Sequence, residues 1–446
     1  MKGAGATSES KRTTCCPLLA ALAVVIMLSF LVLFSPACSN RSSESGSGST
    51  SLPADFPSGK PYFVRVPPPV DWRTLSRPVR SFDMAKKWGP LYDLRHADLS
   101  RLDLADRAQD LRDTFFDTET KWPAGLPLEF DPAKILELNR NPGLGIRSLH
   151  TRGITGKGVA AAIIDTPFLL DHDEYAGRVR YYGEANAWGP ANFHGTLVAS
   201  ILAGRTCGVA PEAEIYYVGS HNFDVSPADN STLPNSTHYA MAINKLLEVN
   251  ARLSPGKKIR VISISAGWSP KNRGFKAMNK AVQRATEAGI FVVSGNVIDM
   301  RKPGFWFWGL DRASSDHPDD VTAYRVPSWN EWISQVRSPD RFDVFFEKRF
   351  KGAGSPELLL IPESSKTVAQ AGGLNEYGFY RVGGWSSLLP YIAGLYALAC
   401  QVKPDITPEV FWKAALATGD PMPVEGKKTT HAGKRVNPAR LMESLW

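Results

Sequence analysis

The sequence contains few cysteines, and none of them has the spacing of a zinc site. Its 446 residues include five cysteines, of which Cys15 and Cys16 are adjacent and Cys38, Cys207 and Cys400 are isolated. A zinc module held by cysteines is therefore excluded. Cys207 and Cys400 lie in apolar stretches, which predicts buried small side chains. A disulfide bridge between these two is the alternative interpretation.

The sequence also lacks a basic stripe with interleaved aromatic residues. The net charge of +8 comes from lysines and arginines that are scattered along the chain among aspartates and glutamates. This distribution argues against nucleic-acid binding, which needs basic residues gathered on one face. With 43% hydrophobic and 22% charged residues, the composition is that of a globular protein and excludes a disordered or fibrous one. The length fits two or three domains, or one large α/β domain.

One long apolar run lies close to the N-terminus. Residues 17–34 are apolar except Ser29, and lysine and arginine residues precede them. The run is just long enough to cross a bilayer, and its positive flank should remain in the cytoplasm. We therefore expect a cytoplasmic tail over residues 1–16 and an uncleaved signal-anchor over residues 17–37, which makes the membrane a predicted partner. A cleaved signal peptide or a lipid anchor at Cys38 is the alternative.

The next part of the chain reads as a linker followed by a small accessory region. Residues 38–60 begin with a run of serine and glycine, which predicts a flexible linker. Residues 61–150 form the accessory region, in which Asp-Leu pairs recur every five residues over 92–106. This stretch resembles the pentapeptide repeat, whose coils stack leucines inward, and an acidic amphipathic loop or helix explains it equally well. We expect the region to be a docking module or an unusual propeptide.

From residue 151 the sequence changes to an alternation of buried strands and helices. Continuous runs of small and β-branched apolar residues predict strands that are buried on both faces. These strands are expected at residues 159–164, 214–218, 258–264 and 290–293. With helical spacing between them, they predict an α/β fold of three layers, in which helices flank a mostly parallel central sheet. We assign residues 151–446 to this domain, with an aromatic-rich insertion at about residues 297–355.

Four polar residues stand at the ends of these predicted elements. Asp165 ends the first strand, and open α/β sheets place their sites at the carboxyl ends of strands. His194 opens a helix of small apolar residues, and Asn296 follows a later strand. Ser386 follows two glycines and opens a second apolar helix, whose N-terminus favours negative charge nearby. Taken alone, Ser386 is more simply interpreted as the N-cap of that helix.

The segments around these residues resemble, in the same order, those of the subtilisin-like (S8) serine peptidase family. The chain order Asp, His, Ser is that of the subtilisin triad. The resemblance covers roughly residues 150–445, and the sequence departs from the family pattern at Pro167, Leu197, Trp385 and residues 387–389. It rests on Gly158 to Thr166 for the aspartate segment, His194-Gly195-Thr196-Leu197-Val198-Ala199 for HGTHVAG, Ser263-Ile264-Ser265-Ala266-Gly267 for SLG, Ser294-Gly295-Asn296 for AGN and Gly384 to Gly394 for GTSMASPHVAG.

The resemblance implies an exported serine endopeptidase that cleaves polypeptides through an acyl-enzyme intermediate. It implies the catalytic residues Asp165, His194 and Ser386, with Ser387 as the second candidate nucleophile. It further implies that Asn296 stabilises the oxyanion, and that the substrate adds as an extended strand along Ser265, Ala266 and Gly267. The alternative function is a catalytically weak or inactive subtilase-like protein that binds peptides.

We expect no metal site and no cofactor, although the family resemblance leaves calcium open. Asp171, Asp173 and Glu174 resemble an acidic cluster of calcium ligands, but no spacing rule supports a metal, and the sequence predicts a solvated turn. His221 lies in none of the motifs and is predicted to be a surface histidine.

Overall fold

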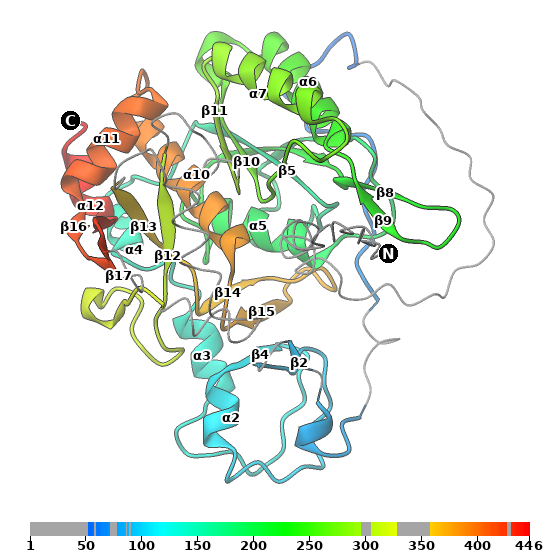
Figure 1. The fold of residues 1–446 in the computed structure, drawn as a ribbon, viewed down its shortest axis with the longest axis vertical. Coiled ribbons are helices and arrows are strands. Elements are labelled where there is room, and N and C mark those ends of the chain that lie inside the picture. Colours follow the sequence, from blue (N-terminus) through cyan, green and yellow to red (C-terminus); the bar gives the residue numbers. More distant parts are fainter. Residues whose placement is uncertain are drawn as a thin grey trace, which may run out of the picture. The chain divides into compact units, whose positions relative to one another are not determined.

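A parallel sheet of six strands lies at the centre of the structure, with helices on both of its faces (Figure 1). The computed structural model describes residues 52–57, 59–71, 78–85, 87–88, 91–295, 305–327, 357–425 and 430–446. Within them every neighbouring pair of the sheet is parallel, in the order β1-β6-β7-β5-β10-β11. The strands are β1 (Tyr62–Phe63), β5 (Ala160–Asp165), β6 (Val179–Glu184), β7 (Glu214–Gly219), β10 (Ile259–Ile264) and β11 (Phe291–Ser294). The predicted three-layer α/β fold is confirmed.

Each face of this sheet carries its own helix layer and its own hydrophobic core. Helices α6 (Thr237–Arg252) and α7 (Phe275–Glu287) pack on one face, whereas α5 (Phe193–Ala203) and α10 (Trp385–Val402) pack on the other (Figure 1). The central strand β5 is buried along its whole length, and its small side chains let both layers approach the sheet. On the α10 side the fit is tight, because a Cβ atom at Gly394 would lie only 2.6 Å from the Cβ of Val209.

Two smaller sheets flank the central one. The first contains β12 (Phe307–Leu310), β13 (Leu358–Pro362), β19 (Gly433–Arg435) and β16 (Asp420–Pro421). The second contains β14 (Lys366–Ala369), β15 (Tyr377–Tyr380), β4 (Thr114–Asp117), β3 (Leu91–Asp93) and β2 (Lys87–Trp88). Two-stranded pairs are formed by β8 (Phe223–Val225) with β9 (Thr232–Pro234) and by β17 (Val424–Glu425) with β18 (Thr430–His431). The other α-helices of the described residues are α2 (Ala108–Arg112), α3 (Pro132–Leu138), α4 (Ile146–Thr151), α11 (Pro408–Thr418) and α12 (Pro438–Glu443).

The second of these sheets joins the predicted accessory region to the rest of the chain. Strand β4 pairs antiparallel with β15, so that Phe116 lies opposite Phe379, and β3 pairs parallel with β4. Hydrophobic contacts follow the same route, since Phe379 belongs to the core of the accessory region and Phe115 to the main core. Strands β3 and β4 of the accessory region and β15 of the main domain therefore belong to one sheet.

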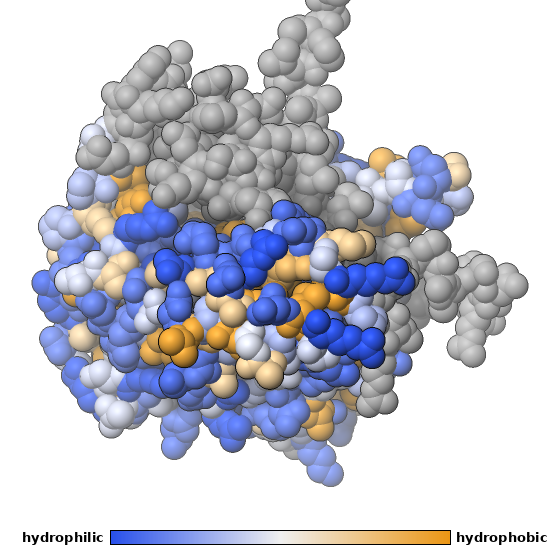
Figure 2. Space-filling model, turned by 90° about the horizontal axis from the view of Figure 1, so that it is seen from below, coloured by the Kyte–Doolittle hydropathy of each residue, from blue (hydrophilic) through white to orange (hydrophobic). Residues whose placement is uncertain are grey.

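The Asp-Leu pairs form a coil with its leucines inside. Leu94, Leu99 and Leu104 are fully buried, at 0% exposure, and pack in the same cluster as Phe116. The carbonyl of each leucine accepts a hydrogen bond from the N–H three residues later, so each pair closes one turn. We call residues 91–107 the leucine coil. Seen from below, the molecule is largely hydrophilic with apolar side chains between (Figure 2). Met84 and Leu128 of the accessory region are exposed.

The structure decides the start of helix α10, the packing of residues 305–310 and the state of two cysteines. Helix α10 begins at Trp385, and its N-cap is Gly384 with a φ of 61°, so Ser386 lies inside the first turn and does not cap the helix. Residues 305–310, at the start of the predicted insertion, pack in the main core. Cys207 and Cys400 are buried as predicted, and both are free thiols.

The N-terminal predictions lie mostly outside the described residues. The tail at 1–16, the segment at 17–37 and the first part of the linker at 38–60 all fall there. The end of that linker packs on the fold, because Phe56 is buried with its ring 6.1 Å from that of Tyr181. Over the described ranges, no helix combines the length and the hydropathy needed to span a bilayer.

Candidate active site

Asp165 and His194 meet at the carboxyl edge of the central sheet. Asp165 is the last residue of β5, and His194 is the second residue of α5. The Nδ1 atom of His194 lies 2.6 Å from Oδ1 of Asp165, and the two residues are only 8% and 2% exposed. A carboxylate at Nδ1 fixes the imidazole tautomer with its proton on that nitrogen, which makes Nε2 the basic nitrogen. The pair therefore has the geometry of an oriented general base.

The approach of α5 to β5 depends on the loop that follows the strand. The side chain of Asn192 caps α5 by accepting the N–H of His194 at 2.9 Å. The hydroxyl of Thr166 accepts the N–H of Gly195 at 3.1 Å, and the Thr166 N–H donates to Oδ1 of Asp165 at 2.8 Å. Gly195 is needed for this approach, because a Cβ atom there would lie 2.2 Å from the Thr166 carbonyl oxygen. Sequence reasoning missed Thr166 and Asn192, which no spacing rule marks.

Ser386 lies at the same edge of the sheet. Strand β10 is the neighbour of β5, and Ile264, its last residue, pairs with Ile164. The next residue, Ser265, donates its hydroxyl to the Ser386 carbonyl at 3.1 Å. Since the carboxyl ends of adjacent parallel strands meet at one edge, this bond joins the start of α10 to the sheet edge at which β5 ends with Asp165.

The two adjacent serines of α10 have different surroundings. Ser387 is 2% exposed, and its hydroxyl donates to the Gly383 carbonyl at 3.1 Å. Ser386 is partly exposed, within the first turn of an apolar helix of 18 residues. The hydroxyl of Ser387 is therefore bound to the turn before the helix, whereas Ser386 is the more exposed of the two serines.

The predicted substrate strand follows β10 directly. Ser265 and Ala266 are buried, and Gly267 is partly exposed. The Ala266 carbonyl accepts the N–H of Gly295 at 2.9 Å, which ties this stretch to the end of β11. Asn296, the predicted oxyanion residue, lies outside the described residues.

Aromatic side chains gather next to Asp165, after β7 and before α5. The ring of His221 lies 4.0 Å from that of Trp188 and 5.3 Å from that of Phe223. His221 is buried, so the prediction of a surface histidine was wrong. Burial lowers the pKa of His221 to about 4, although the negative charge of Asp165 acts to raise it. The imidazole is therefore neutral at pH 7 and packs as an uncharged ring between Trp188 and Phe223.

The acidic residues at 171–174 form no solvated turn at Glu174. Its carboxylate is fully buried and accepts hydrogen bonds from the Tyr377 hydroxyl at 2.8 Å and from Thr206 at 2.6 and 2.9 Å. Burial acts to raise the pKa of Glu174, but these hydrogen bonds outweigh it and lower the pKa below its ordinary value. Among the described residues, no group of histidine, cysteine, aspartate or glutamate side chains is arranged to hold a metal ion.

Comparison with known families identifies this part of the chain. The model described as "Subtilase family" of peptidases matches residues 156–315, which include Asp165 and His194. The chain carries a subtilase domain. Its parallel sheet and flanking helices agree with that family.

Known subtilases resemble this chain at low identity. The subtilisin-like protease PopC of Myxococcus xanthus (strain DK1622) is 24% identical over 328 residues, which are 66% of this chain and 62% of PopC. The extracellular serine proteinase of Thermus sp. (strain Rt41A) is 26% identical over 276 residues, 61% of this chain and 58% of the relative. The chain thus spans about 60% of the length of these curated relatives. The solved structure of the prenylagaramide maturation protease PagA matches with a TM-score of 0.44 and 20% identity, over 68% of this chain and 98% of PagA.

Proposed function

We propose that this protein is a serine endopeptidase with the triad Asp165, His194 and Ser386. The observation that carries the proposal is the buried contact of 2.6 Å between Asp165 and His194, at the sheet edge where α10 begins. A serine hydroxyl is a weak nucleophile at neutral pH, so it needs a base whose orientation is already set. The side chain of Asp165, held by Thr166, supplies that orientation.

In the proposed reaction, His194 takes the hydroxyl proton as Ser386 Oγ attacks the scissile carbonyl. Asp165 stabilises the imidazolium that forms, and the proton then passes to the leaving amine as the acyl-enzyme appears. Water attacks the ester in the second half, again with His194 as the base. We assign oxyanion stabilisation to the Asn296 side chain and the Ser386 backbone N–H, where one such donor contributes about 3 kcal/mol.

The altered residues around Ser386 are compatible with this chemistry. Trp385 replaces the threonine of the family motif, and its ring packs edge to face on Trp308 at 6.0 Å. The larger side chain thus packs against β12, to which Trp308 belongs. The leucines at 388 and 389 are fully buried in the main core. We therefore propose that these departures change the packing behind the nucleophile and leave its proton-transfer partners in place.

We further propose that the enzyme acts outside the cytoplasm on polypeptides that bind in extended form along Gly267. The relative from Thermus is named an extracellular proteinase, and the apolar run at 17–34 with its basic flank has the orientation of a signal-anchor. Externally added protease should therefore digest the subtilase domain in intact cells. Full protection, with digestion only after lysis, would contradict the orientation.

Labelling with an alkyl fluorophosphonate tests the triad directly. We expect the wild type and Ser387→Ala to be labelled, and Ser386→Ala to remain unlabelled. Ser387→Ala is the matched control, because it removes the adjacent hydroxyl, which bonds to Gly383. An unlabelled wild type that still binds extended peptides would instead indicate the peptide-binding function. Labelling of Ser386→Ala that is lost in Ser387→Ala would move the nucleophile by one residue.

A further inference from the structure

Arg95 of the leucine coil contacts the segments that carry both His194 and Ser386. Its guanidinium carbon lies 5.5 Å from the ring centroid of Phe193, the residue directly before His194. It lies 4.9 Å from the ring centroid of Tyr380, at the end of the strand from which the chain runs on to Ser386. A planar guanidinium stacks well on aromatic faces, which makes this an effective contact to both segments.

The guanidinium is itself held by several polar partners. Asp93 accepts a bidentate pair, with Nε to Oδ1 and Nη2 to Oδ2 both at 2.8 Å. The third donor, Nη1, bonds to the Tyr380 hydroxyl, which also accepts from Gln370 at 3.1 Å. Because its charge is paired with Asp93 and all three of its nitrogens donate a hydrogen bond, Arg95 is suited to position its neighbours and not to bind a charged substrate.

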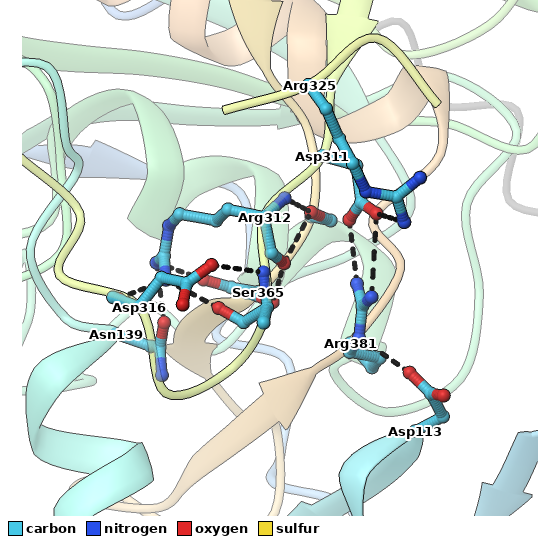
Figure 3. A network of polar contacts seen from close by, with 10 residues as sticks. Asp113, Asn139, Asp311, Arg312, Asp316, Arg325, Ser365 and Arg381 are labelled. Carbon is cyan, nitrogen blue, oxygen red and sulfur yellow. Dashed lines mark hydrogen bonds and ion pairs between the residues drawn. The ribbon is translucent and has the colours of Figure 1, made fainter. Parts of the chain in front are cut away.

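Each contact has a short path to a proposed catalytic group. The rings of Phe193 and His194 meet at 90° with centroids 6.1 Å apart. A shift of the phenyl ring therefore changes the packing surface against which the imidazole rests. On the other side, Arg381 follows Tyr380 and pairs with Asp113 at 2.9 Å and with Asp311 at 2.7 Å (Figure 3). The chain before Ser386 is thus tied to the accessory region at two consecutive residues.

We propose that Arg95 is a positioning residue of the active site. It fixes the position of helix α5, which carries His194, relative to the segment that leads to Ser386. This inference rests on the proposed peptidase function. It also implies that the leucine coil is retained in the active enzyme, because the coil carries Arg95 and β4 is hydrogen-bonded to β15. A removable propeptide would take both of these contacts with it.

Arg107 supplies a matched control within the same coil. Its guanidinium lies 5.6 Å from the ring of Phe82 and pairs with Asp83 at 3.3 Å and with Asp110 at 3.1 Å. Arg107 therefore combines a cation–π contact with carboxylates, as Arg95 does, but these partners all lie in the accessory region. The variants Arg95→Met and Arg107→Met remove the same group, and their melting temperatures report any general loss of stability.

The first readout is the rate at which an alkyl fluorophosphonate labels Ser386. We expect Arg95→Met to react at least about 10-fold more slowly than the wild type, because small misplacements of catalytic groups are costly. Arg107→Met should react at the wild-type rate. Arg95→Lys keeps the charge but loses the planar fork, and should recover only part of the rate. Equal rates for Arg95→Met and Arg107→Met would overturn the inference.

The second readout needs no catalysis, so it separates the two proposals. The low-field ¹H NMR signal of the proton between His194 Nδ1 and Asp165 should shift or broaden in Arg95→Met and stay unchanged in Arg107→Met. A wild type that is never labelled would refute the peptidase function, while this signal still decides the role of Arg95. If the signal is unchanged in Arg95→Met and this variant is labelled at the wild-type rate, the positioning role is refuted and the peptidase function stands.

Discussion

Replacing Asp165 by asparagine separates charge from geometry at the centre of the site. Oδ1 of Asp165 accepts both the imidazole of His194 at 2.6 Å and the backbone N–H of Thr166 at 2.8 Å. That backbone N–H requires an acceptor, so an asparagine side chain must point its oxygen, and not its NH₂ group, toward this position. The oxygen then also accepts the imidazole N–H, and the tautomer of His194 is preserved. Only the negative charge is lost.

The size of the effect follows from the distance between the charges. A carboxylate and an imidazolium about 4 Å apart interact by about 4 kcal/mol at an effective dielectric constant of about 20. This attraction exists only when the imidazole is protonated, so its loss raises the barrier and leaves substrate binding nearly unchanged. At 1.36 kcal/mol for each factor of ten, kcat should fall by about 10³-fold. An amide with its NH₂ group toward the imidazole would select the wrong tautomer and cost about 10⁴-fold.

Steady-state cleavage of a chromogenic peptide anilide, normalised to the folded protein by thermal melting, measures this change. Ser386→Ala sets the floor of the assay, and KM of Asp165→Asn should remain within about threefold of the wild type. A decrease in kcat of less than about 10-fold would refute the role assigned to the charge. A normal kcat with a strongly raised KM would show that Asp165 acts in binding.

Three further substitutions test the packing around the site. Leu99→Ala should lower the free energy of unfolding in urea by about 2–5 kcal/mol, because the side chain is fully buried. Leu128→Ala, on the surface, should change it by less than about 0.5 kcal/mol. Equal effects would contradict the inward orientation of the leucines in the leucine coil. Gly195→Ala should lower kcat at least about 100-fold, since its Cβ atom would meet a backbone oxygen at 2.2 Å, and Gly256→Ala, with open space around it, should leave kcat unchanged. Burial raises the pKa of Glu363 to about 8, so the stability that its neutral carboxyl contributes is full at low pH and is lost as the pH rises toward 8. Thermal melts should show that Glu363→Gln removes this decline of stability with pH. A steeper decline in the variant would contradict the assignment.

The fold and the proposed triad were accessible from the sequence because their signals are local. Strand β5 reads as a buried parallel strand from its run of alanine and isoleucine, and Asp165 marks the end of that strand. His194 and Ser386 are each followed by a helix of small apolar residues, which is visible without any tertiary contact. The start of α10 is not a local property of the sequence, because serine and glycine are both acceptable N-caps and only the backbone geometry decides between Ser386 and Gly384.

The residues that hold the site in place carry no comparable signal. Thr166 and Arg95 act through partners that lie 29 and 285 positions away, on Gly195 and Tyr380. The burial of His221 depends on Trp188 folding over it from another loop. Such contacts exist only after the sheets have formed, since they join segments that have no common period.

By itself, the sequence determined the order of strands and helices, the small residues that let the layers approach, and the polar groups at the strand ends. Their periodicity and chemistry are local properties, which any chain with this pattern expresses. Only the tertiary structure decided that the leucine coil belongs to the same body as the subtilase domain, because the pairing of β4 with β15 joins residues that lie more than 250 positions apart. The closure of such long loops is stabilised by the assembled core as a whole, and no short pattern encodes it.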